Sequence, residues 1–92
     1  MQISNLKKEK IKEQILAFLF SKSPQFFFTS QIAEEIARDE EFVKNLLLDL
    51  KKKKFVVEVR KNSFGVDYLR RSRWKLSDAV YETYKKYQSN KL

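Results

Sequence analysis

The side chains with the clearest chemical potential are basic and cluster in one quarter of the chain. Residues 51–75 hold ten Lys and Arg against two acidic residues, a net charge of +8, whereas residues 1–50 carry −1 and residues 76–92 carry +1. The ten are Lys51, Lys52, Lys53, Lys54, Arg60, Lys61, Arg70, Arg71, Arg73 and Lys75. Such a localised excess is typical of proteins that bind the phosphate backbone of nucleic acids, although a solubilising face has the same composition.

Two polar side chains ahead of this segment have the chemistry to read DNA bases. Lys44 can donate to guanine O6 and N7, and Asn45 can bind the N6/N7 edge of adenine with two hydrogen bonds. Ser30 and Gln31 stand at the start of another predicted helix, where they either bind a phosphate or only cap the helix. Each of the four is also an ordinary residue for an exposed helix position.

Phosphate contacts are expected from two groups of basic residues. Lys51 and Lys52 lie at the end of a predicted helix, where they either contact the DNA backbone or only favour the helix dipole. Arginines in a hairpin have no packing role and suit phosphates and narrow minor grooves. The hairpin candidates are Lys61, Arg70, Arg71 and Arg73. Phe64 and Tyr68 either stack on a ligand or, more simply, anchor the loop, and we assign Trp74 to the core.

Catalysis finds little support in the sequence. The chain has no Cys and no His, which excludes disulfides, thiolate chemistry, Cys/His zinc sites and nucleophile–histidine pairs. The spacing of Asp49, Glu58 and Arg60 is faintly similar to nuclease patterns, but Arg cannot readily give up a proton in place of the usual Lys. The acidic residues lie on different predicted elements and would not hold magnesium together. We therefore expect no enzyme, no metal and no cofactor.

Length and hydropathy predict one small intracellular domain spanning residues 1–92. A chain of 92 residues can build one modest core. The apolar runs at residues 15–20 and 26–28 are far shorter than the roughly 20 residues of a membrane span. The polar N-terminus lacks the apolar stretch of a signal peptide. We expect a cytoplasmic, nucleoid-associated protein without membrane contacts.

Apolar periodicity predicts the elements in the first half of the chain. Residues of about 5–20 form a helix with Leu6, Ile11, Ile15, Phe18 and Leu19 on one face, which Pro24 terminates. Residues 26–28 form a short strand with two Phe side chains inward. A helix of about residues 31–38 follows, capped by Thr29 or Ser30. The next helix, about residues 40–53, is capped by Asp39 and buries a stripe of Phe42, Val43, Leu46, Leu47 and Leu50.

The second half predicts a hairpin and a final helix. Residues of about 55–76 form a basic β-hairpin, in which the inward face of the first strand is either Phe55/Val57/Val59 or Val56. Ser77 or Asp78 caps a helix of about residues 78–88. Its apolar face is one that a small core does not fully cover, and we expect it to form a homodimer interface together with the start of the first helix. The residues of this interface are Val80, Tyr81, Tyr84 and Tyr87.

The fold class is mainly α with a small antiparallel sheet, in the order α-β-α-α-β-β-α. Residues 29–36, 42–52 and 73–78 resemble the second helix, the recognition helix and the end of the wing of the winged helix-turn-helix family. Its small size, its high lysine, isoleucine and phenylalanine content and its tyrosine-bearing tail are similar to those of small archaeal and archaeal-virus regulators. The sequence departs from the family at Lys54, where glycine is usual, and at the acidic start of the recognition helix, Asp39, Glu40 and Glu41.

The resemblance implies sequence-specific binding of double-stranded DNA by a transcriptional regulator. The recognition helix, residues 40–53, would enter the major groove, and the wing, residues 55–76, would lie on the backbone or in the minor groove. Two alternatives stay open. One is a winged-helix protein-interaction module of the transcription or replication machinery, in which the acidic helix start meets a basic partner, and the other is RNA binding.

Overall fold

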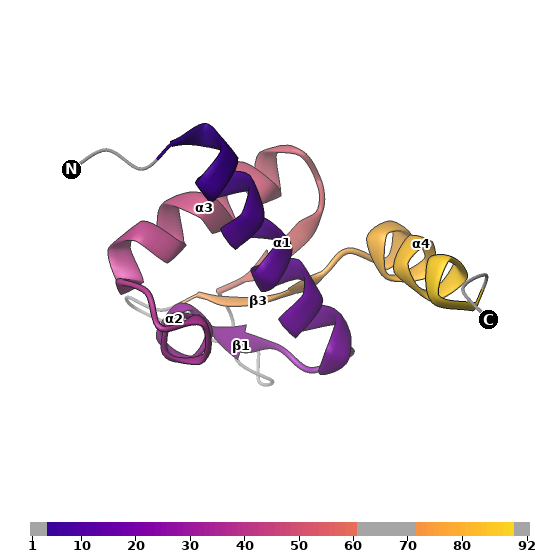
Figure 1. The fold of residues 1–92 in the computed structure, drawn as a ribbon. Coiled ribbons are helices and arrows are strands. Elements are labelled where there is room, and N and C mark those ends of the chain that lie inside the picture. The colour runs from indigo at the N-terminus through magenta and orange to yellow at the C-terminus, as the bar shows by residue number, and fades with distance from the viewer. Residues whose placement is uncertain (1–3, 61–71, 90–92) are drawn as a thin grey trace.

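The computed structural model describes residues 4–60 and 72–89 of the chain, with side chains up to residue 87. Within these residues, four helices and a three-stranded antiparallel sheet follow in the predicted order, which confirms the fold class. The elements are α1 (Asn5–Ser21), β1 (Phe27–Phe28), α2 (Thr29–Ile36), α3 (Glu40–Lys52), β2 (Val56–Val59), β3 (Arg73–Leu76) and α4 (Asp78–Ser89). In Figure 1, α1, α2 and α3 gather around the sheet, and α4 leads away from them.

Helix α1 supplies one wall of the core. The Ser4 side chain accepts a hydrogen bond from the Lys7 N–H and caps the helix. Ile11, Ile15, Leu16 and Leu19 are buried at three- and four-residue intervals. The expectation that Leu6 shares this core face is wrong, since 68% of Leu6 is exposed. The core begins at Ile11, so the first turn of α1 extends beyond it.

Helix α2 begins two residues earlier than predicted, and neither Thr29 nor Ser30 is its N-cap. The N-cap is Phe28, whose backbone N–H donates to Gln31 Oε1 at 2.9 Å. Thr29 is the first residue of the helix, and its hydroxyl accepts a 2.8 Å hydrogen bond from Trp74 Nε1. The helix also ends early, at Ile36, because Ala37 takes a left-handed conformation with φ 56° and turns the chain toward α3.

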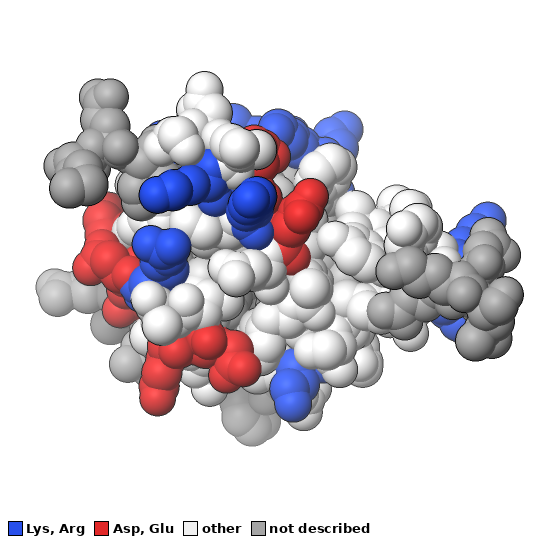
Figure 2. Space-filling model, viewed as in Figure 1, with Lys and Arg blue, Asp and Glu red and all other residues white. Residues whose placement is uncertain are grey.

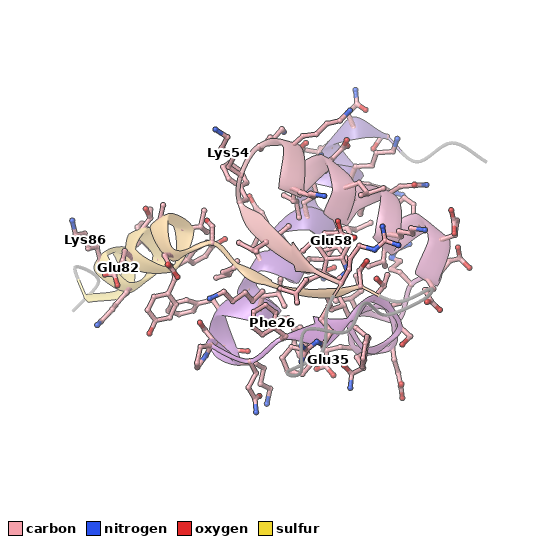
Figure 3. All side chains as sticks on the ribbon, turned by 180° about the vertical axis from the view of Figure 1, so that it is seen from behind. Phe26, Glu35, Lys54, Glu58, Glu82 and Lys86 are labelled. Carbon is pink, nitrogen blue, oxygen red and sulfur yellow. The ribbon has the colours of Figure 1, made fainter. Side chains whose placement is uncertain are left out.

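Helix α3 is capped as predicted, with Asp39 Oδ2 accepting from the Phe42 N–H at 3.2 Å. Val43, Leu46, Leu47 and Leu50 are buried, as the predicted stripe requires, while Phe42 is only half-buried against the core. After α3, Lys54 adopts φ 65° where glycine would be the easier residue. Its N–H donates to the Lys51 carbonyl at 2.9 Å, which holds the turn that leads into β2 (Figure 3).

The sheet has the order β1-β3-β2, with β3 in the centre. Directly paired residues of antiparallel strands share a face, so the pairing of Val56 with Leu76 and of Phe27 with Trp74 defines the face toward the helices. Val56, Trp74 and Leu76 are buried there. This settles the facing of β2: Val56 is the inward residue, and Phe55 and Val57 are exposed.

The last helix is tied to the body through α1. Ser77 Oγ accepts from the Val80 N–H at 3.3 Å, so the helix start is capped by Ser77 rather than Asp78. The centre of the Phe20 ring lies 5.4 Å from the ring centres of both Tyr81 and Tyr84. Burial raises the pKa of the Tyr84 hydroxyl, and the nearby charge of Glu13 adds to this shift. None of the helices in the described ranges has the length and apolar character needed to cross a bilayer.

Candidate nucleic-acid interface

A cleft opens between the start of α2, the outer side of α3 and the hairpin of β2 and β3. We call it the α3–β2 cleft. Its lining residues are Phe28, Thr29, Ser30, Glu40, Glu41, Lys44, Leu48, Lys51, Glu58, Arg60 and Ser72. Three elements distant in sequence therefore present polar and charged side chains to one hollow, next to the two helices of the helix-turn-helix.

Helix α3 contributes its outward row to the cleft. Lys44, Leu48 and Lys51 follow one another at intervals of four and three residues, which places them on one side of the helix. The buried residues Leu46, Leu47 and Leu50 lie on the other side. Leu48 is 37% exposed. Leu48 was not among the predicted site residues. Its position off the apolar stripe of the helix was the signal that could have identified it.

Glu58 connects α3 to both strands of the hairpin. Its carboxylate accepts a 2.7 Å hydrogen bond from Lys51 Nζ and another from the Ser72 hydroxyl (Figure 3). Burial raises the pKa of this carboxyl, but the hydrogen bonds from Lys51 and Ser72 and the charges of Lys51 and Arg60 outweigh burial, and the pKa lies below its ordinary value of 4.5. Glu58 stays ionised and neutralises part of the positive charge of the cleft.

The charges that line the cleft are balanced rather than uniformly basic. Lys44, Lys51 and Arg60 face Glu40, Glu41 and Glu58. Figure 2 shows acidic side chains gathered over α2 and the start of α3. Arg60 is exposed and lines the cleft, but it was not among the predicted site residues. Its place in the basic segment was the signal that could have identified it.

Apart from Arg73, the predicted DNA-binding residues fall into three groups. Ser30, Lys44 and Lys51 line the cleft. Gln31, Asn45 and Lys52 are exposed but are not among its lining residues, and the Oε1 atom of Gln31 is occupied by the Phe28 N–H. The predicted contacts Lys61, Arg70 and Arg71, together with Phe64 and Tyr68, lie outside the described residues.

Arg73 lies on the opposite face of the sheet from the core. Its guanidinium carbon is 5.3 Å from the centre of the Phe26 ring, and Lys75 Nζ is 5.4 Å from the same ring centre. Both distances are typical of cation–π contacts. Phe26 therefore holds two basic side chains of β3 on the outer face of the hairpin, apart from the α3–β2 cleft. Trp74, between them in sequence, is fully buried, as predicted.

The predicted dimer residues differ in how far the body of the protein covers them. Val80, Tyr81 and Tyr84 are half-buried and pack against the core. Tyr87, farther along α4, is 62% exposed.

Of the described residues, no group of three or more acidic side chains is placed to hold a metal ion.

Comparison with known proteins connects this geometry to solved structures. No protein-family model and no curated protein matches the chain. The structure is similar to Staphylococcus aureus MepR in a DNA complex, with a TM-score of 0.71, 21% identity, and coverage of 95% of this chain and 63% of MepR. Another MepR structure, described as a transcription regulator of the multidrug efflux pump MepA, has a TM-score of 0.67 and 23% identity. This match covers 96% of this chain and 57% of MepR.

A structure of Lactococcus lactis ZitR is also similar, with a TM-score of 0.68, 18% identity, and coverage of 97% of this chain and 56% of ZitR. The chain thus spans less than two thirds of the length of these proteins. The chain has the winged helix-turn-helix fold.

Proposed function

We propose that the chain binds double-stranded DNA sequence-specifically and regulates transcription. In this proposal α3 enters the major groove, and the basic hairpin of β2 and β3 lies on the backbone or in the minor groove. Lys44 and Asn45 are our candidates for base contacts, and Ser30, Lys51 and Arg60 for phosphate contacts. In this proposal the protein acts by binding alone, and we propose no enzymatic activity.

The observation that carries the proposal is the exposed row of α3 beside the hairpin. Lys44 from α3 and Arg60 from the end of β2 line one cleft, so a duplex that enters it meets donors from both elements. The similarity to MepR, which has been crystallised with DNA, supports the same use of the fold. The net charge of +8 in residues 51–75 supplies the electrostatic attraction that duplex binding requires.

Titration of labelled duplex DNA at several salt concentrations tests the proposal. Replacing Arg60 with Gln should weaken binding to all duplexes and reduce the slope of log affinity against log salt by about 0.9, the value of one phosphate contact. Lys10→Gln on α1 removes the same charge at an exposed position outside the cleft and should leave the slope unchanged. Equal effects of the two substitutions would contradict a specific interface.

The acidic start of α3 keeps protein binding as the second candidate function. Glu40 and Glu41 are exposed and line the cleft, where they would repel phosphates and attract a basic protein surface. A chain that shows no salt-sensitive shift of duplex DNA would favour this function. Preferential competition by structured RNA would instead favour RNA binding.

We further propose that the protein is a homodimer through its terminal helices. The support is that α4 leads away from the body in Figure 1 and that Tyr87 is largely exposed on it. A two-fold dimer would place two α3 helices about 34 Å apart, one turn of DNA, and would bind a pseudo-palindromic site. Light scattering at micromolar concentration should give the mass of two chains, and Tyr87→Asp should reduce it to one. The mass of a single chain for the unmodified protein, also when bound to DNA, would refute the dimer.

A further inference from the structure

Leu48 occupies an unusual position for a leucine. It lies in the middle of the outward row of α3, one turn after Lys44 and one turn before Lys51, and all three line the α3–β2 cleft. Within α3, which the structure describes completely, Leu48 is the only exposed apolar side chain. The other leucines of the helix, Leu46, Leu47 and Leu50, are at most 3% exposed.

Contacts among the described residues do not account for this leucine. Leu48 belongs neither to the buried core nor to the partly buried side chains that pack against it. The described residues of the hairpin that line the cleft with it are polar or charged, namely Glu58, Arg60 and Ser72. Leu48 therefore presents apolar surface to whatever enters the cleft.

We infer that Leu48 recognises the 5-methyl group of a thymine, so that the DNA site carries an A·T pair opposite the middle of α3. This inference rests on the proposed function. The thymine methyl is the apolar group on the base edges of the major groove. Lys44, one turn before Leu48, carries a donor for the base acceptors next to such a methyl group, and Lys51, our candidate for a phosphate contact, lies one turn after it. Leu48 is therefore a specificity-determining residue of the cleft.

The size and setting of the apolar surface favour DNA over a protein partner. Surfaces that bind proteins present contiguous apolar patches, whereas a single leucine between two lysines offers apolar contact of the size of one methyl group. Lysines are moreover depleted at the centres of protein interfaces. A protein partner would leave Lys44 and Lys51 to be desolvated on both sides of one small contact.

Substitution of uracil for thymine removes only the methyl group and tests the inference directly. Duplexes selected by the unmodified protein from a random pool would be resynthesised with deoxyuridine at one thymine position at a time. At one position in each half-site the unmodified protein should lose about fourfold in affinity, the factor expected for burial of one methyl group. Leu48→Ala should bind the thymine and uracil duplexes equally.

Phe55→Ala is the control, because Phe55 is an exposed apolar residue between α3 and β2 that lies outside both the cleft and the proposed dimer interface. This variant should keep the full thymine preference. Duplex binding without any thymine preference, or with a preference that Leu48→Ala retains, would overturn the role of Leu48 while leaving the proposed function intact. A protein that binds no duplex at all would overturn both.

Discussion

One buried hydrogen bond holds the start of the helix-turn-helix against the sheet. Trp74 Nε1 on β3 donates to Thr29 Oγ1, the first residue of α2, at 2.8 Å. Trp74 is fully buried and Thr29 is 8% exposed, so the bond is largely shielded from solvent. The next residue, Ser30, lines the α3–β2 cleft. The bond therefore fixes where α2 begins relative to the candidate site.

Replacing Thr29 with Val keeps the shape of the side chain but removes the acceptor. The indole N–H would be left buried and unpaired, which costs about 1–3 kcal/mol of folding free energy. In a domain of this size, each 1 kcal/mol lowers the melting temperature by about 4–8 °C. Urea and thermal unfolding, followed by the fluorescence of Trp74, the only tryptophan in the chain, would measure the loss.

Thr29→Ser is the control, because it removes a methyl group and keeps the hydroxyl. Its cost should be about 0.5–1.5 kcal/mol, by analogy with the loss of one buried methyl group in Ile→Val, and it should leave the emission of Trp74 unchanged. The sign of the change in stability for Thr29→Val is the decisive result. Without the hydrogen bond, Val at position 29 would add apolar burial and stabilise the protein. A Val variant as stable as the unmodified protein would therefore refute this account of how α2 is anchored.

Three further predictions concern charge and backbone. Because the pKa of Glu58 is lowered on folding, its interactions stabilise the protein above the ordinary pKa of 4.5 and are lost as the pH falls through the lower folded value. The stability difference between the unmodified protein and Glu58→Gln should thus shrink below pH 4.5 in urea titrations, and a pH-independent difference would contradict it. Lys54→Gly should stabilise by about 0.5–1 kcal/mol because φ is 65°, whereas Lys53→Gly, at φ −82°, should destabilise in the same unfolding assay. Replacing Arg70 and Arg71 with Ala should lower the salt slope of duplex binding by about 0.9 per lost contact at an unchanged melting temperature, and an unchanged slope would remove these arginines from the interface.

Local patterns account for what could be predicted from the sequence. The three- and four-residue spacing of apolar residues in α1 and α3 depends only on helix geometry, so the helices and most of the core follow from it. The cap of α3 is equally local, since Asp39 bonds to an N–H three residues ahead. The basic segment identified the hairpin side of the molecule as the candidate interface because charge can be counted without a structure.

Contacts between distant residues decided the rest. Thr29 was predicted as a cap because its local chemistry allows it, but in the structure its oxygen accepts from Trp74, 45 residues away, and Phe28 is the N-cap. Lys51 was predicted as a phosphate ligand, and the structure pairs it with Glu58 from another element. The composition of the cleft was likewise beyond prediction. Leu48 and Arg60 line the same cleft only because the turn at Lys54 folds β2 back along α3. The residue pattern within either segment does not predict this contact.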